Sequence, residues 1–281
     1  MSALLPLISI NGIPDAMISS LDRGFTYGDG VFETCRCTSG RIPLWDFHRE
    51  RLINSARRLQ IPLDEPRLQE YLDKLLLNLQ FNQYPDTVIK IQITRGVGGR
   101  GYRLPDQVNP TYCIGIFAGN HLQSPLFLNG VDIRVCDLRL GKNPALAGIK
   151  HLNRLEHILA RAEWHDEFAE GLLLDGDNNL IEATVSNVFI VKNKQLYTPD
   201  LSSSGVAGVM RRTLIEKLAP AINVLVNIES MPYESLLDAD EILLTNSVFG
   251  IWPVKNVAGV STNLHHSITR QLQQQLIQLL G

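Results

Sequence analysis

The order of the expected strands and helices constrains the fold of this chain more than any other feature of its sequence. Residues 87–94 alternate apolar and polar side chains, which predicts a strand with one buried face. Residues 111–118 and 131–135 form two further, mostly apolar strands. Helical patterns occur before and after these strands without a regular strand–helix–strand alternation. The sequence therefore predicts an α+β fold rather than a doubly wound sheet.

Other elements are expected on both sides of these strands. Two helices, at 45–59 and 64–79, follow a strand at 31–36, and Asp46 and Asp64 are the expected N-caps. In the second half, the predicted helices are 152–166, 210–218 and 262–280, and the predicted strands are 171–174, 180–183, 187–191, 195–198, 224–228 and 241–245.

The length and one turn-rich stretch indicate two domains. At 281 residues the chain exceeds a single average domain, and residues 121–130 contain turn-forming pairs such as Ser124-Pro125. We therefore expect a smaller α/β N-terminal domain at 1–120, an interdomain linker at 121–130 and a larger C-terminal domain at 131–281.

The composition argues against several classes of partner. A formal net charge of −3 with 20% charged residues gives no basic surface for a nucleic acid or an anionic membrane. The N-terminus has no signal-peptide pattern, and no run approaches the roughly 20 apolar residues of a membrane span, so a cytoplasmic protein is expected. The four cysteines lack metal-binding spacing, so we expect reduced thiols and no metal site.

Lys150 is the first candidate for chemistry. It follows an apolar approach and directly precedes a helical pattern. A lysine that is desolvated there would have a nucleophilic amine, as Schiff-base chemistry requires. The alternative from spacing alone is a surface lysine whose stem packs on apolar residues.

Glu182 is the second candidate, because it interrupts an apolar strand. A semi-buried carboxylate needs a partner, which could be a protonated pyridine nitrogen or an arginine in a structural ion pair. Gly205 and Gly208 stand before a helical pattern, where backbone N–H groups can bind a phosphate. Their spacing matches neither the dinucleotide-binding nor the nucleotide-binding glycine motif.

Three arginines are candidates for binding anions. Arg51 borders the apolar face of a predicted helix and could present a planar fork to a buried phosphate. Arg95 and Arg100 belong to a glycine-rich loop that suits capture of a carboxylate. A surface arginine and a plain mobile hairpin are the alternatives.

Together these segments resemble the fold-type IV pyridoxal-phosphate enzymes, the family that contains branched-chain aminotransferase, D-amino-acid aminotransferase and aminodeoxychorismate lyase. The resemblance covers nearly the whole chain, from residues 11–12 and 27–33 to residues 244–247 and 253–254. Two segments, 95–102 and 139–156, look most like the aminodeoxychorismate lyases. A two-domain α+β fold follows from the resemblance.

The resemblance also assigns roles. It implies that pyridoxal 5'-phosphate is held as a Schiff base on Lys150, with Glu182 as the partner of the pyridine nitrogen. The position of Arg154 is near that of a tyrosine that aminotransferases place beside the cofactor's phenolic oxygen. The implied phosphate site consists of Arg51, the backbone N–H groups of Val209 and Met210, and Ser247. The implied substrate-binding residues are Tyr27, Thr34, Arg36 and Arg100.

The implied activity is that of a lyase. Arg100 occupies the stretch that binds the substrate carboxylate in D-amino-acid aminotransferases, but their Arg-Asn-His triplet is Arg100-Gly-Tyr here. We expect conversion of 4-amino-4-deoxychorismate to 4-aminobenzoate and pyruvate in folate biosynthesis, with Lys150 as the proton shuttle. A branched-chain or D-amino-acid aminotransferase and a non-catalytic binding module are the alternatives. The family also implies a homodimer that acts on a small molecule.

Overall fold

An antiparallel sheet of five strands organises the N-terminal part of the chain, in the order β2-β1-β5-β4-β3. The strand expected at 87–94 is confirmed, because Ile89, Ile91 and Ile93 of β4 are fully buried while the residues between them are partly exposed. The five strands are β1 (Leu7–Ile10), β2 (Ile13–Pro14), β3 (Gly30–Thr38), β4 (Asp86–Thr94) and β5 (Thr111–Ala118).

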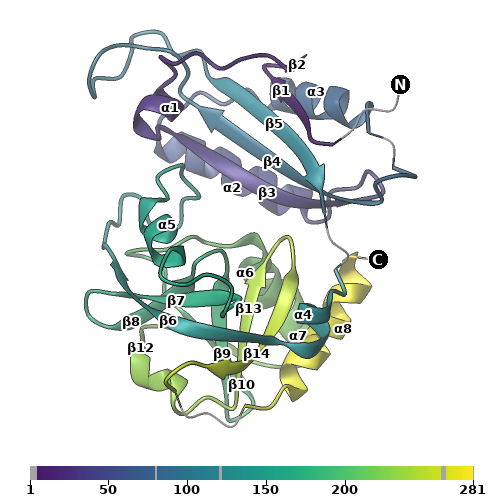
Figure 1. Cartoon of the computed structure of the whole chain (residues 1–281), viewed down its shortest axis with the longest axis vertical. Helices are drawn as coiled ribbons and strands as arrows, with labels where there is room; N and C mark the ends of the chain where they lie inside the picture. Colours follow the sequence, from purple (N-terminus) through teal and green to yellow (C-terminus); the bar gives the residue numbers. More distant parts are fainter. Residues whose placement is uncertain (1–4, 80, 120–121, 261–263, 281) are drawn as a thin grey trace. The chain divides into compact units, whose positions relative to one another are not determined.

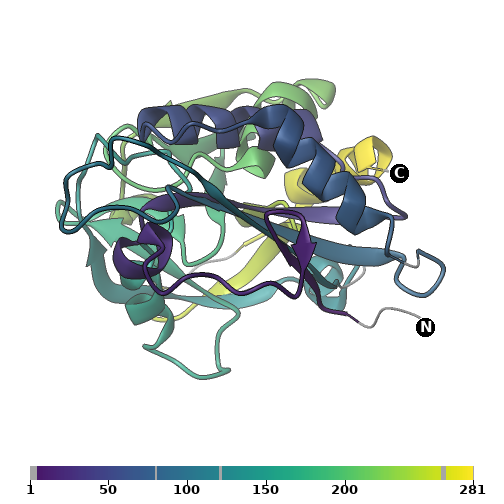
Figure 2. The same cartoon turned by 90° about the horizontal axis from the view of Figure 1, so that it is seen from above.

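Two helices, α2 (Trp45–Arg58) and α3 (Glu65–Leu76), cover one face of this sheet. Figure 2 shows both on the same side of the strands. Asp64 caps α3 by accepting a hydrogen bond from the backbone of Arg67, as expected. The cap expected at Asp46 is wrong: Leu44, in the left-handed region, precedes α2, and Asp46 lies in its first turn. A short helix, α1 (Arg23–Tyr27), precedes β3.

The chain divides into two units, shown in Figure 1. The structure, a computed structural model, describes residues 5–79, 81–119, 122–260 and 264–280. Unit 1 contains Met1–His121 and Ile149–Asn153, and unit 2 contains Leu122–Gly148 and Arg154–Gly281. The expected linker began at residue 121, which lies outside the described residues, and its later part contains the helix α4 (Pro125–Asn129). Lys150, which we expected in the C-terminal domain, is grouped with unit 1.

A mixed sheet of nine strands organises unit 2, in the order β11-β10-β9-β13-β14-β6-β7-β8-β12. The strand β14 contains Pro253 and was not expected from the sequence, since proline cannot donate a ladder hydrogen bond. The nine strands are β6 (Val131–Leu140), β7 (Glu170–Asp175), β8 (Asn179–Ala183), β9 (Asn187–Lys192), β10 (Gln195–Pro199), β11 (Val226–Glu229), β12 (Met231–Pro232), β13 (Glu241–Asn246) and β14 (Gly250–Val257).

The helices of unit 2 differ from the expected ones in type or in length. The helix predicted at 210–218 is α6 (Val209–Thr213) followed by a π-helical turn, η1 (Leu214–Leu218). The helix predicted at 262–280 is α8 (Ser267–Leu280), and residues 262 and 263 lie outside the described residues. The remaining pieces are α7 (Ala219–Ala221) and the 3₁₀ turn η2 (Tyr233–Leu236). No described helix combines the length and apolar composition that crossing a membrane requires.

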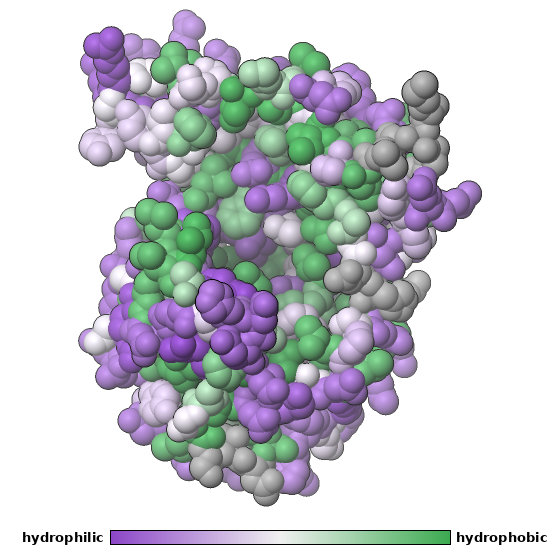
Figure 3. Space-filling model, viewed as in Figure 1, coloured by the Kyte–Doolittle hydropathy of each residue, from purple (hydrophilic) through white to green (hydrophobic). Residues whose placement is uncertain are grey.

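The helix α5 (Leu155–Arg161) exposes its apolar side chains. It is much shorter than the expected 152–166. Leu155, Ile158 and Leu159 are 73%, 61% and 60% exposed, although their spacing is that of a buried helix face. Figure 3 shows the apolar surface that gathers over α5.

Candidate active site

Lys150 lies on a short extended segment that pairs with the outer edge of β3. The backbone N–H of Phe32 donates to the carbonyl of Lys150 at 2.9 Å, and that of Leu152 donates to Gly30 at 3.0 Å. Between them, Val31 and His151 form an antiparallel bridge. The Nζ atom of Lys150 lies 4.3 Å from the centre of the Phe32 ring, a cation–π distance. The lysine is therefore held against β3 through its backbone and its side chain.

Glu33, on β3, is a fully buried carboxylate that binds two side chains of α2. Arg51 donates through Nε to Oε1 at 2.7 Å and through Nη2 to Oε2 at 2.5 Å. Nδ1 of His48 lies 2.6 Å from Oε2. Burial raises the pKa of Glu33, but Arg51 and His48 outweigh it and hold that pKa at about 2. Burial lowers the pKa of His48, and the charge of Glu33 opposes that effect.

This arrangement bears on the phosphate role expected for Arg51. Two of its donor atoms point to Glu33, which fixes the plane of the guanidinium.

The ligand atoms of Glu33, Cys35 and His48 lie within 4.8 Å of one another, so they could in principle hold a metal ion. Both Glu33 oxygens already accept hydrogen bonds, and burial raises the pKa of the Cys35 thiol well above its usual value. The contacts therefore indicate that Glu33 binds the guanidinium of Arg51 and not a metal ion.

Glu182, in unit 2, is also a buried carboxylate, with 3% of its surface exposed. It lies on β8, where Oε2 accepts a hydrogen bond from the backbone N–H of Val206 at 2.8 Å. Oε1 lies 2.9 Å from Nε2 of His157 on α5. Arg154, at the N-cap of α5, interacts electrostatically with Glu182. Burial lowers the pKa of Arg154, and the charges of Glu182 and Glu156 oppose that effect.

The segment around Gly205 supports Glu182 from its other side. Gly205 has φ +81°, and a Cβ atom there would lie 2.8 Å from Ile181 and 3.3 Å from Oε2 of Glu182. Its carbonyl accepts a hydrogen bond from Gly148 at 2.9 Å, and Gly148 accepts one from Ala207 at 3.2 Å. Gly148 stands two residues before Lys150 in the chain. The same segment thus fixes the Glu182 contact and the backbone of Gly148.

The residues expected to hold a phosphate in unit 2 lie on neighbouring elements. Val209 and Met210 form the first turn of α6, and Gly208 precedes them without a side-chain cap. Ser247 directly follows β13, which packs against α6. The Oγ1 atom of Thr245 is buried and has no hydrogen-bond partner among the described residues. An uncapped helix start and an unpaired hydroxyl fit an anionic group such as the cofactor's phosphate.

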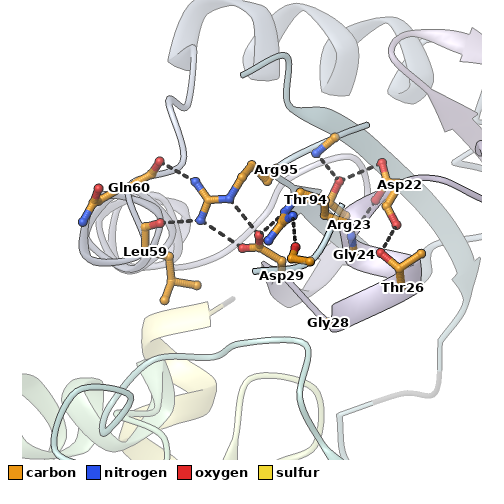
Figure 4. A network of polar contacts seen from close by, with 12 residues as sticks. Asp22, Arg23, Gly24, Thr26, Gly28, Asp29, Leu59, Gln60, Thr94 and Arg95 are labelled. Carbon is orange, nitrogen blue, oxygen red and sulfur yellow. Dashed lines mark hydrogen bonds and ion pairs between the residues drawn. The ribbon is translucent and has the colours of Figure 1, made fainter. Parts of the chain in front are cut away.

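The glycine-rich loop after β4 is anchored by a network of ion pairs, drawn in Figure 4. Asp29 accepts from Arg23 at 2.8 Å and from Arg95 at 2.7 Å. Arg95 also donates to the carbonyls of Leu59 and Gln60 at 2.7 and 2.8 Å, and only 3% of its surface is exposed. Arg95 therefore has a structural role in place of the carboxylate capture considered from the sequence.

The other end of that loop is more accessible. Arg23 donates to the carbonyl of Gly101 at 3.0 Å, which ties the loop to α1. Arg100, the neighbouring residue, is exposed. The rings of Tyr27 and Tyr102 meet edge to face at 5.7 Å, and Tyr102 is 87% exposed.

Thr34 and Arg36 lie on β3 and share a face with Phe32, because side chains alternate along a strand. Phe32 is the residue whose ring contacts the amine of Lys150. Arg36 donates to Asp86 at 3.0 Å, and burial lowers its pKa against the opposing charge of Asp86. Two residues expected to bind substrate thus lie on the lysine side of β3.

The expected site residues fall into two sets, one in each unit. Unit 1 contains Lys150, Arg51, Tyr27, Thr34, Arg36 and Arg100, and unit 2 contains Arg154, Glu182, Val209, Met210 and Ser247. Sequence reasoning gave no role to Glu33, His48, Thr245 or His157. His157 stands three residues after Arg154, on the same side of a predicted helix, and that spacing could have identified it.

The half-buried Lys150 and the buried Glu182 belong to a fold whose class is identified by comparison with known proteins. Residues 30–257 match the family model of amino-transferase class IV, so the chain belongs to the aminotransferase class IV family. The aminodeoxychorismate lyase of Vibrio harveyi is 38% identical over 271 residues, which are 95% of this chain and 98% of that protein.

Two further proteins are similar to this chain over nearly its whole length. The crystal structure of 4-amino-4-deoxychorismate lyase from Pseudomonas aeruginosa is similar with a TM-score of 0.89 and 41% identity, covering 97% of this chain and 98% of that one. A putative branched-chain-amino-acid aminotransferase of Methanocaldococcus jannaschii is 33% identical over 272 residues, 92% of this chain and 90% of that protein. The similarity to fold-type IV enzymes expected from the sequence is confirmed.

Proposed function

We propose that the chain is an aminodeoxychorismate lyase, which converts 4-amino-4-deoxychorismate to 4-aminobenzoate and pyruvate. The observation that supports it most is its similarity, over nearly its whole length, to the lyases of V. harveyi and P. aeruginosa at 38% and 41% identity. The aminotransferase of M. jannaschii is less similar, at 33% identity.

The cofactor is pyridoxal 5'-phosphate. When bound, it supplies an electron sink for the negative charge that forms when a substrate C–H bond breaks. Lys150 would hold it through Nζ, and Glu182 would pair with its ring nitrogen. Arg51, the start of α6 and Ser247 would hold its phosphate, and the buried hydroxyl of Thr245 supports an anionic group there.

The chain's own residues then have simple tasks. Nζ of Lys150, freed when the substrate amine takes its place, would remove the proton from the substrate carbon that carries the amine. The bond between the ring and the enolpyruvyl oxygen breaks, enolpyruvate leaves and becomes pyruvate, and the remaining ring becomes aromatic. Since aromatisation drives the reaction, orienting the substrate and removing one proton is most of what the protein must do. Thr34, Arg36, Tyr27 and Arg100 are the residues we propose to orient it.

Incubation of the cofactor-loaded protein with 4-amino-4-deoxychorismate tests the lyase directly. We expect 4-aminobenzoate and pyruvate in equal amounts, and Lys150→Ala should lower the rate by at least about 100-fold, because the proton-transfer group is lost. Borohydride should label the wild-type protein on Lys150. A loaded, borohydride-labelled protein that releases no 4-aminobenzoate would contradict the lyase assignment.

An aminotransferase is the second candidate, favoured by the M. jannaschii relative. It would transfer the amine of a branched-chain or D-amino acid to 2-oxoglutarate. Product analysis with both substrates separates the two, because a transaminase forms glutamate from 2-oxoglutarate and a lyase forms 4-aminobenzoate. Glutamate formation that is faster than 4-aminobenzoate formation would favour the aminotransferase.

We also propose that the chain is a homodimer. Apolar side chains are exposed in each unit: Met17 and Phe25 are 91% and 73% exposed in unit 1, and Leu155, Ile158 and Leu159 are exposed on α5 in unit 2. Large exposed apolar patches are rare on monomers and typical of protein interfaces. A second copy of the chain is the partner that would cover them.

A further inference from the structure

Among the described residues, Val206 and His157 each make a hydrogen bond to one carboxylate oxygen of Glu182. Val206 binds Oε2 through its backbone, and His157 binds Oε1 through Nε2 at 2.9 Å. A carboxylate oxygen accepts up to two hydrogen bonds, so each oxygen retains the capacity for one more. The two contacts therefore fix the orientation of the carboxylate without using up its acceptor sites.

The protonation of His157 follows from its other nitrogen. Nδ1 is buried and has no hydrogen-bond partner among the described residues. A doubly protonated ring would leave a buried N–H group unpaired beside it, which costs more than an unpaired lone pair. The neutral ring with its proton on Nε2 satisfies the contact, so His157 donates and Glu182 accepts.

We propose that His157 is a positioning residue that acts through Glu182 to hold the carboxylate ready for the cofactor's ring nitrogen. This inference rests on the proposed role of Glu182. Arg154 interacts electrostatically with Glu182, and His157 makes a hydrogen bond to it. A hydrogen bond from this donor holds the carboxylate in one rotamer.

A purely structural role for His157 would be to attach α5 to the sheet. The helix has other attachments, because Ala160 is fully buried and Glu156 accepts a hydrogen bond at 2.8 Å from the backbone N–H of Gly141, which directly follows β6. Loss of the His157 contact therefore leaves α5 attached, and the effect on Glu182 can be observed separately.

The test compares two substitutions of His157 in the cofactor-loaded protein. His157→Gln keeps an N–H donor at nearly the same place, whereas His157→Leu removes the donor and keeps a similar volume. We expect His157→Leu to raise the dissociation constant for pyridoxal 5'-phosphate about 10-fold, as for loss of one hydrogen bond to a charged group. It should also shift the absorbance bands of the bound cofactor and lower kcat with little change in KM. His157→Gln should restore most of each property.

Two controls make the test specific. His165→Leu replaces an exposed histidine just beyond α5 and should leave the absorbance bands and the dissociation constant unchanged. In a Glu182→Gln background, His157→Leu should have almost no further effect, because both act on the same contact. Wild-type cofactor binding and spectra in His157→Leu would overturn the proposal. Equal losses in His157→Leu and His157→Gln would also overturn it, because they would indicate a purely structural role for His157.

The outcome is independent of the lyase assignment. Cofactor affinity and absorbance are measured with pyridoxal 5'-phosphate alone and need no substrate. A protein that makes no 4-aminobenzoate, but whose spectrum changes in His157→Leu and is restored in His157→Gln, would refute the lyase and support the inference. If the protein makes 4-aminobenzoate and cofactor binding is unchanged in His157→Leu, the lyase assignment is supported and the inference about His157 is refuted.

Discussion

Glu33 shows how one buried charge depends on its neighbours. It lies in the core side of β3, where an unpaired carboxylate would be unstable, and Arg51 and His48 of α2 supply the missing interactions. The same contacts orient Arg51, the residue proposed to bind phosphate. The carboxylate thus links the stability of unit 1 to the geometry of its proposed anion site.

The pKa of Glu33 gives a prediction for stability. Since that pKa falls from 4.5 to about 2 on folding, the contacts stabilise the folded state above pH 4.5, and this stabilisation is lost as the pH falls toward 2. The shift corresponds to about 3 kcal/mol in the free energy of unfolding. Denaturant unfolding at a series of pH values should show this loss in the wild type.

Glu33→Gln removes the titrating group and should flatten that pH dependence. At neutral pH it should also lower the free energy of unfolding by about 3–5 kcal/mol, because Arg51 loses its partner. Glu229→Gln, at an exposed glutamate, is the matched control and should leave the curve unchanged. The prediction is wrong if wild type and Glu33→Gln have the same pH dependence.

Residue patterns alone identified only part of the candidate site. Lys150 and Glu182 could be chosen because a charged residue inside an apolar stretch stands out in a sequence. Glu33 and His48 lie in different elements, 15 residues apart, and nothing local shows that strand and helix bring them together. The alternation of β3 places Glu33 inward, but its partners depend on how α2 packs.

At the scale of elements, the turn before α6 is the most constrained piece. Gly205 is in the left-handed region, and the space beside it is filled by Ile181 and Leu201. Its carbonyl and the backbone of Val206 connect Gly148 and Glu182. A side chain at position 205 would strain the backbone and push this turn away from both.

We therefore expect Gly205→Ala to lower the free energy of unfolding by about 1–3 kcal/mol and to weaken binding of pyridoxal 5'-phosphate. Thermal unfolding and cofactor titration measure the two effects. Gly176→Ala is the control, because no atom lies within 4 Å of the added carbon and its φ is not positive. Equal behaviour of the two variants would show that the turn is more adaptable than its geometry indicates.

Elements with a strong period were predictable, and elements shaped by packing were not. The strands at 87–94 and 111–118 agree with β4 and β5 to within one residue. The helix expected at 152–166 is only Leu155–Arg161, because Leu152 belongs to the segment that pairs with β3. The spacing of Leu155, Ile158 and Leu159 was read as a buried face, whereas all three are exposed.

For the whole molecule, the segment that contains the lysine is grouped with the N-terminal unit, although it follows the first residues of unit 2 in the chain. Turn residues marked the boundary near 121, but residues 149–153 are grouped with unit 1 through non-local backbone pairing. When a sequence is divided by position along the chain, a segment is assigned to the domain that surrounds it in the sequence. Pairing with an edge strand more than 100 residues earlier leaves no local signal.

The proposed homodimer makes a prediction at this scale. Phe25→Glu and Leu159→Glu each place a charge in an exposed apolar patch, so each should shift the protein from dimer to monomer in analytical ultracentrifugation. Leu77→Glu, at an 86% exposed leucine after α3, is the matched control and should remain dimeric. A wild-type protein that sediments as a monomer at micromolar concentration would refute the homodimer.

The pairing of Ile149–Asn153 with β3 also sets the order in which unit 1 is completed on the ribosome. The strands and helices up to residue 119 emerge first, and the outer edge of β3 has no partner until residues 149–153 have been made. An open strand edge is a template for pairing with other chains. The nascent protein is therefore most prone to aggregate during this interval, and synthesis of the cofactor lysine and its neighbours is the event that ends it.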